Sequence, residues 1–354
     1  MDEIVIKKKL INRKNKFELT QDLNNENFKR ITCSFYKYIK INDPQSIVEE
    51  LLESWSKYKI LGRVYIASEG INAQLSVPEF SWNNLINFLN NHKYFSSIPI
   101  KKAIVEKGGA FIKLNIKLKN KLVADGLNDN EYNINKTGKH LAAKEFNDAM
   151  DEPKSIVVDM RNYYESEIGH FEEAICPDAA TFKEVLPLVK KKLENNKNDK
   201  ILMYCTGGIR CEKASAYLIH NGFKNVYQLE GGIIDYSHQI KEKNLESKFK
   251  GSNFVFDGRF NESVSDDIIS SCHQCNSPSN QHTNCNNQAC HILFIQCKVC
   301  LKKYDGCCSL ECKAVFKLPI DEQKKIRKNT HLAAPLKQYQ ILKTIDISDK
   351  NKKF

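Results

Sequence analysis

Nine of the chain's 13 cysteines lie in one short stretch, between Cys272 and Cys312. The CxxC spacing occurs twice within it, at Cys272 and Cys275 and at Cys297 and Cys300. This spacing lets two thiolates of one tight turn coordinate the same tetrahedral ion. So short a segment holds too little apolar material to fold by itself. The spacing therefore predicts a cysteine-rich module whose backbone is held by bound metal.

Four pairs of cysteines could close two sites of four thiolates each. Adjacent cysteines are not expected to share one ion, so one member of the pair at 307 and 308 is left out. Zinc is the expected metal, with an iron–sulfur cluster or metal-free thiols as alternatives. Histidines at 273, 282 and 291 could replace single ligands. The candidate ligands are Cys272, Cys275, Cys285, Cys290, Cys297, Cys300, Cys307 and Cys312.

The start of the chain bears on its compartment. The first ten residues, MDEIVIKKKL, place acids before a short apolar run and lysines after it, which is the wrong order for a secretory signal. Cysteines in a reducing compartment are more often thiols and metal ligands than disulfides. No apolar run approaches the roughly 18 residues of a membrane span. We therefore expect a cytoplasmic protein with no membrane partner.

The length of the chain suggests two or three domains. Residues 1–30 are polar with little periodicity, and we expect a flexible lead segment there. Residues 31–124 show the order strand, helix, two strands, helix, strand, which is the ferredoxin-like unit. Residues 146–245 alternate short apolar strands with helices, which predicts a parallel α/β sheet. The cysteine-rich module follows at 250–335, and a basic tail at 336–354. The expected class is thus a multidomain chain of α+β and α/β type.

Two local features refine this organisation. Asp43 followed by Pro44 is a helix cap with proline at the first helical position, so a helix should begin there. Strand-like runs are expected near 98–105 and 111–118. The Asn-rich stretch 125–139 indicates a polar linker between the first two domains.

The stretch Tyr204 to Ala216, YCTGGIRCEKASA, joins a predicted strand at 201–204 to a predicted helix. Ligands of an open parallel sheet bind beyond the carboxyl ends of its strands, where helix N-termini face them. The two glycines allow the backbone to curl with its N–H groups inward. Together with the cation of Arg210 they should lower the pKa of Cys205 and hold a reactive thiolate. A buried structural cysteine is the alternative.

The spacing of this loop argues against phosphate chemistry. A cysteine phosphatase cradle has the pattern CxxxxxR, whereas Arg210 follows Cys205 after only four residues and Cys211 stands at the phosphatase arginine position. The shorter cradle suits a sulfur-centred intermediate. It resembles the rhodanese domain, in which the corresponding cysteine carries a persulfide. The resemblance makes Cys205 and Arg210 the candidate catalytic pair, with active-loop support from Thr206, Gly207, Gly208, Ile209 and Cys211.

Flanking residues extend the rhodanese resemblance. Asp159 and Arg161 match an Asp-x-Arg strand end, Glu165 follows as an acidic residue, and Gly169-His-Phe and Leu229-Glu-Gly-Gly match two turns. We expect Asp159 and Arg161 to support the loop through ion pairs, with acid–base catalysis as the alternative. His170 is interpreted as a core histidine.

Cys211 has two interpretations of its own. It either packs against the sheet at the start of the helix or resolves an oxidised Cys205.

The whole chain resembles a specific family, the rhodanese-containing tRNA uridine hydroxylases. The resemblance rests on the ferredoxin-like or acylphosphatase-like first domain, the YCTGGIRCEKASA loop, and a cysteine-rich end containing LFIQC at 293–297. It implies oxygen-dependent hydroxylation of the wobble uridine of tRNA to 5-hydroxyuridine, with molecular oxygen as co-substrate and Cys205 essential. The implied partner is the anticodon stem-loop. No flavin, haem or nicotinamide motif identifies an electron donor.

The first domain departs from active acylphosphatases, because Lys40 to Pro44 stands where a glycine-rich, arginine-bearing phosphate loop is needed. We expect it to contact RNA or to act as a scaffold.

The charge distribution is consistent with an RNA partner. The net charge is +11, and from Lys298 to the end 14 basic residues face 6 acidic ones. This excess favours contact with phosphates, although a general bias toward Lys and Asn explains it equally well. Two further functions fit the same features: a sulfurtransferase that passes persulfide sulfur from Cys205 to an acceptor, and a non-catalytic RNA-binding zinc protein.

Overall fold

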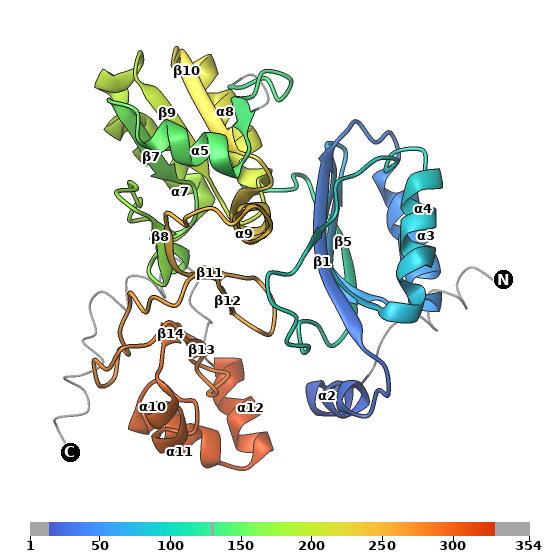
Figure 1. Ribbon diagram of the computed structural model, residues 1–354. Coiled ribbons are helices and arrows are strands. Elements are labelled where there is room, and N and C mark those ends of the chain that lie inside the picture. The colour runs from blue at the N-terminus through green and yellow to red at the C-terminus, as the bar shows by residue number, and fades with distance from the viewer. Residues whose placement is uncertain (1–13, 129–130, 330–354) are drawn as a thin grey trace. The chain divides into compact units, whose positions relative to one another are not determined.

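The computed structural model describes residues 14–128 and 131–329 (Figure 1). The chain divides into two compact units. The first runs to Ala124 and includes Phe256–Arg259, and the second holds the remainder from Asp125 onward. In the described ranges, no helix combines the length and the apolarity needed to cross a bilayer. The basic tail expected at 336–354 lies outside the described residues.

The first unit is built on a five-stranded sheet of order β4-β1-β3-β2-β5. Its strands are β1 (Arg30–Tyr38), β2 (Leu61–Ala67), β3 (Gly70–Pro78), β4 (Lys101–Lys102) and β5 (Leu114–Leu118). The first four are antiparallel neighbours, whereas β5 adds a parallel edge strand beside β2. With the helices α3 (Pro44–Lys57) and α4 (Trp82–Asn91), these four strands have the ferredoxin-like order. The prediction for this domain is confirmed, although the strand expected at 98–105 is only two residues long.

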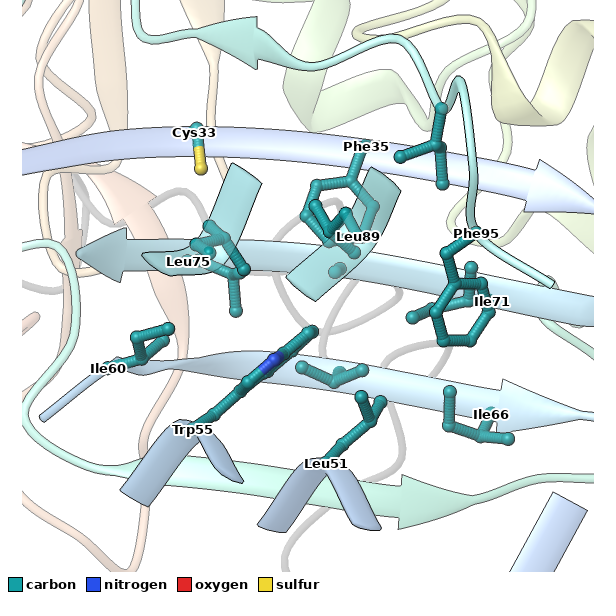
Figure 2. Close-up of a cluster of buried hydrophobic side chains, with 14 of the residues drawn as sticks. Cys33, Phe35, Leu51, Trp55, Ile60, Ile66, Ile71, Leu75, Leu89 and Phe95 are labelled. Atoms are coloured by element: carbon teal, nitrogen blue, oxygen red, sulfur yellow. The ribbon is translucent and has the colours of Figure 1, made fainter. Parts of the chain in front are cut away.

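Both helices cover one face of this sheet, and the core lies between them and the strands (Figures 1 and 2). On α3, Leu51 and Trp55 are completely buried at helical spacing, and Leu89 of α4 meets them. The strands contribute every second residue, such as Ile71 and Leu75 of β3, because alternate side chains of a strand share a face. As expected, Asp43 caps α3 by accepting a hydrogen bond from the backbone of Ser46, at 3.1 Å. The short 3₁₀ helix η1 (Glu79–Ser81) precedes α4.

Regular structure begins earlier than the sequence predicts. Helix α2 (Lys16–Asn24) lies inside the segment expected to be flexible. Asn15 and Glu18 form a reciprocal capping box at its N-terminus. The apolar signal was weak because Leu19 is the only buried residue of this helix. Residues 16–24 of the lead segment are therefore helical, which the sequence did not predict.

The second unit contains a four-stranded sheet of order β6-β10-β9-β7, all parallel, as predicted. Its strands are β6 (Lys139–Leu141), β7 (Ser155–Asp159), β9 (Lys200–Tyr204) and β10 (Asn225–Leu229). The helical segments around it are α5 (Ala143–Met150), α6 (Tyr163–Ser166), α7 (Phe182–Lys192), η2 (Glu194–Asn196), α8 (Ile209–His220) and α9 (Gly232–Lys243). Strand β9 lies between β10 and β7, so Cys205, the residue after its carboxyl end, has a strand on either side.

Smaller elements complete this unit. An antiparallel sheet is formed by β8 (Gly169–Phe171), β11 (Phe249–Phe254) and β12 (Asn261–Ser263). The cysteine-rich module contains the hairpin of β13 (His282–Asn284) and β14 (Leu293–Ile295), then α10 (Lys298–Lys303), α11 (Leu310–Lys317) and α12 (Ile320–Asn329).

The stretch expected to be a polar linker is anchored at its start. Asp125 and Lys213 of α8 are both buried and form an ion pair at 2.7 Å. A buried charge of this kind needs its partner, because neither group can be left unpaired away from water. The segment after Ala124 is therefore fixed to the helix that follows the Cys205 loop.

Candidate active site and cysteine-rich module

Cys205 follows directly after β9 and is completely buried. The backbone N–H of Gly208 points back at it and lies 3.2 Å from its Sγ. Gly208 is the N-cap of α8 and has a φ of 100°, a conformation that favours glycine. The predicted arrangement of strand end, curled loop and helix N-terminus is thus present around this sulfur.

Helix α9 also holds the Cys205 loop in place. The N-terminus of α9 donates two backbone hydrogen bonds, from Ile233 to the carbonyl of Cys205 at 3.0 Å and from Ile234 to the carbonyl of Thr206 at 3.2 Å. Close approach is allowed by Gly232, which has a φ of +68°. A Cβ atom at this position would lie only 2.5 Å from the Cys205 carbonyl oxygen. The glycine pair at 231–232 therefore has a clear steric role.

Arg210 is held beside the loop by Glu165 of α6. Two hydrogen bonds join the guanidinium to the carboxylate, at 2.6 and 2.7 Å, and Glu165 is completely buried. The hydroxyl of Thr206 accepts a further bond from Arg210 at 3.2 Å and lies 3.3 Å from the carboxylate. Bidentate pairing fixes the direction of the guanidinium as well as its charge. Glu165 belongs to the upstream motif of the sequence but was not among the predicted site residues.

The environment of Cys205 favours the thiolate. Burial by itself raises the pKa of this thiol, but three influences outweigh it: a hydrogen bond from the Cys211 thiol, the positive charge of Arg210, and the backbone N–H groups of Cys211 and Arg210. The pKa of Cys205 falls from 9.0 to about 6. Burial and the hydrogen bond to Cys205 raise the pKa of Cys211 well above its ordinary value. At neutral pH the loop therefore holds a thiolate next to a protonated thiol.

Asp159 and Arg161 form a separate pair at the end of β7. Both are completely buried, and the guanidinium bonds the carboxylate at 2.6 to 3.0 Å and the carbonyl of Gly169 at 2.6 Å. Because burial and the ion pair occupy both groups, the arrangement fits the predicted supporting role by tying β7 to β8. On β8, His170 is partly buried and has its Nδ1 atom 3.0 Å from the carbonyl oxygen of Phe171.

Eight cysteines of the C-terminal module gather in two groups of four. One contains Cys272, Cys275, Cys297 and Cys300, and the other contains Cys285, Cys290, Cys308 and Cys312. Within each group all four sulfurs lie within 4.8 Å of one another. Both groups draw on a helix N-terminus, since Cys297 caps α10 and Ser309, the residue after Cys308, caps α11. Neither group includes a histidine, so the expected histidine substitutions are not seen.

Comparison with known proteins connects the loop and the module. Three family models match along the chain: a UPF0176 acylphosphatase-like domain at residues 30–122, a rhodanese-like domain at 142–239 and a rhodanese C-terminal domain at 250–313. A tRNA uridine(34) hydroxylase of Leptospira interrogans is 52% identical over 88% of this chain and 84% of its own length. Proteins of the same name from Pectobacterium carotovorum and Yersinia pestis are 47% and 46% identical, over 90% of this chain and of their own lengths.

This chain belongs to the tRNA uridine(34) hydroxylase family. The resemblance drawn from the YCTGGIRCEKASA loop and from the domain order is thereby confirmed. Membership also marks the chain as an enzyme of the hydroxylase class.

In this hydroxylase-family chain, one predicted metal ligand is corrected. Cys307 was one of the eight candidate ligands, but Cys308 stands in the second group instead, with its sulfur 3.7 Å from that of Cys290 and 3.6 Å from that of Cys312. The thiol of Cys307 instead lies 3.8 Å from the carbonyl oxygen of Asp305. The start of α11 explains this choice. Cys308 stands directly before the N-cap Ser309 and four residues before Cys312, so its thiol reaches the thiol of Cys312 in the first turn of the helix.

The module also contacts the domain that carries the active loop of this hydroxylase-family chain. His273, inside the first CxxC turn, places Nε2 2.9 Å from a carboxylate oxygen of Glu167. Glu167 ends α6, the short helix that carries Glu165. Beside this contact, Ile295 of β14 packs in a buried cluster with Ile168 and Phe254. The short helix α6 thus carries Glu165, the partner of Arg210, and its C-cap Glu167 contacts the module.

Proposed function

We propose that this chain hydroxylates carbon 5 of uridine 34 in tRNA, with molecular oxygen as co-substrate and the Cys205 thiolate as the essential group. The proposal rests on family membership. The observation that carries it in this chain is the buried sulfur of Cys205, which lies against the N–H of Gly208 and whose pKa is lowered by the Cys211 thiol and the Arg210 cation. The family relationship favours hydroxylation over the sulfurtransferase alternative. The thiolate is the nucleophilic form of cysteine, and it is oxidised more readily than the neutral thiol.

The experiment that tests this function replaces one sulfur. Cys205→Ala is expected to reduce 5-hydroxyuridine to background when the gene is expressed in cells lacking other uridine 34 hydroxylases, as measured by nucleoside mass spectrometry. Cys176→Ala is the matched control, because this partly buried cysteine lies outside the loop. Its 5-hydroxyuridine level should equal that of the wild type. An unchanged level in Cys205→Ala contradicts the proposal.

The proposed partner is the anticodon stem-loop, bound in part by the basic C-terminal helices. On α12, Lys325, Arg327 and Lys328 are exposed. Contacts of Lys and Arg with phosphates release counterions, so affinity falls steeply with salt. Replacing these three residues with Gln is expected to weaken tRNA binding and to flatten its salt dependence in a titration from 50 to 200 mM salt. Equal salt slopes for variant and wild type would remove α12 from the interface.

The proposed metal is zinc, one ion in each group of four cysteines. Tetrahedral zinc with bonds of about 2.3 Å places its sulfurs about 3.8 Å apart, and the measured separations of 3.6 and 3.7 Å fit this geometry. A cluster of several iron atoms needs more room between the thiolates. The ions would cross-link the module and supply folding free energy. Elemental analysis of purified protein should give two zinc per chain, and stoichiometric iron would contradict the assignment.

A further inference from the structure

We propose that Cys211 is a second catalytic residue, which forms with Cys205 a dithiol that supplies the two electrons for hydroxylation and leaves the loop as a Cys205–Cys211 disulfide. This inference rests on the proposed function and names the electron donor that the reaction needs.

The geometry of the loop carries the inference. Cys205 and Cys211 are both completely buried, at the end of β9 and in the first turn of α8. The Cys211 thiol and its backbone N–H both lower the pKa of Cys205 as hydrogen-bond donors, which places Cys211 beside this sulfur. The chain between them turns tightly around Gly208, whose N–H meets Cys205 Sγ at 3.2 Å and whose carbonyl accepts from the Cys211 N–H at 2.9 Å. The strand end and the start of the helix thus bring both cysteines into the same loop.

The two sulfurs are also in different protonation states. Cys205 is a thiolate at neutral pH, whereas Cys211 keeps its proton and donates it in the hydrogen bond. An S–S bond closes only when one sulfur attacks another that has been oxidised. In this pair the Cys205 thiolate is the sulfur that oxygen oxidises, and Cys211 is the neighbouring sulfur that closes the disulfide. The buried Cys33 and Cys176 differ, since burial raises the pKa of each thiol to about 12.

The electrons and atoms of the reaction balance with this pair. Uridine, O₂ and the two thiols give 5-hydroxyuridine, water and one disulfide. The C5–H bond of the base and the O–O bond break, and a C–O bond, an S–S bond and the O–H bonds of water form. One oxygen atom enters the base, and the other is reduced to water by the two electrons of the sulfur pair, with one proton from the S–H bond of Cys211 and one from solvent. A small-molecule or protein thiol then reduces the disulfide by exchange, which permits another turnover.

A single-turnover experiment tests the inference. The full-length, metal-loaded protein is reduced, freed of reductant under anaerobic conditions, and mixed with excess unmodified tRNA before oxygen is admitted. We expect one 5-hydroxyuridine per chain by nucleoside mass spectrometry, and an equal amount of Cys205–Cys211 disulfide by peptide mapping after alkylation. An aerobic sample without tRNA should form the disulfide at least tenfold more slowly. Added dithiothreitol should restore further turnover.

Cys211→Ser separates the electron-donor role from a structural one, because serine keeps a hydrogen-bond donor to Cys205. Without reductant, its single-turnover yield is expected to fall at least tenfold, while Cys176→Ser should match the wild type. Wild-type-level product from Cys211→Ser, or product from the wild type with both sulfurs still reduced, overturns the inference and leaves the proposed function standing. Wild-type protein that makes no product even with oxygen and excess thiol overturns the proposed function, and this inference with it.

Discussion

The second unit uses cysteine in two contrasting ways. In the active loop, a single sulfur, Cys205, is made anionic by hydrogen bonds and by the cation of Arg210. In the C-terminal module, eight sulfurs lie in groups where each is surrounded mainly by other sulfurs. The loop is built on a parallel sheet with a large apolar core, whereas the apolar clusters of the module consist largely of the cysteines themselves. The neighbours of each cysteine therefore differ: charged and hydrogen-bonding groups surround Cys205, as the proposed catalytic role requires, and other thiols surround the module cysteines, as the proposed zinc sites require.

The largest expected effect tests the module side of this contrast. Cys300→Ser should remove one of two bound zinc ions and unfold the surrounding turn, because metal binding of this kind contributes on the order of 10 kcal/mol to folding. Cys307→Ser is the matched control, since this buried cysteine lies outside both groups of four. Zinc content and protection of module amides from hydrogen exchange measure the effect. Loss of zinc from Cys307→Ser, or two zinc ions in Cys300→Ser, contradicts the ligand sets.

A smaller effect is expected on the loop side, where a carboxylate and not a metal holds the structure. Glu165→Gln leaves the buried Arg210 cation without its charged partner, which should cost about 3 to 5 kcal/mol of unfolding free energy. Denaturant titration measures this loss. The control Glu53→Gln removes the exposed pair with Lys57 and should leave the unfolding curve unchanged. Equal curves for the two variants would show that the Glu165 pair does not stabilise the loop.

Two glycines test how closely the loop is packed. Gly232→Ala places a Cβ against the Cys205 carbonyl at a positive φ, so we expect a cost of about 1 to 3 kcal/mol and a loss of hydroxylation through displacement of the loop. Gly207→Ala adds a Cβ with no heavy atom within 4 Å and should be tolerated. Activity and thermal midpoint measure both variants. A Gly207→Ala variant as impaired as Gly232→Ala would contradict the observed packing.

The smallest predicted effect concerns pH. Because the pKa of Cys205 is about 6, the thiolate fraction rises as pH increases through 6, and a thiolate-dependent rate should be about tenfold lower at pH 5 than at pH 7. Cys211→Ala removes a hydrogen bond that lowers this pKa, so the midpoint should move upward. The pH profile of Cys205 alkylation, read by peptide mass spectrometry, gives both midpoints. A wild-type midpoint near 9 would show an ordinary thiol.

Local patterns explain how much could be predicted from the sequence. Features that depend on residues only a few positions apart were predicted. These are the strand β9, the Cys205 loop and the two CxxC turns. The bond between Glu165 and Arg210 spans 45 residues, so only the fold reveals which carboxylate meets the cation. The choice of Cys308 over Cys307 depends on where α11 starts, which sequence spacing leaves open. Helices α2 and α5 and the strand β6 were missed because they are short, so each offers too few turns or alternations for a periodic pattern to stand out.

The contact between His273 and Glu167 connects the cysteine-rich module to the helix beside the Cys205 loop. Glu167 and Glu165 lie two residues apart, and the first meets the CxxC turn while the second meets Arg210. If the module binds zinc as proposed, a chain without the metal lacks a firm anchor for the helical turn that carries Glu165. Metal starvation would then lower the activity of the loop without any change at Cys205 itself.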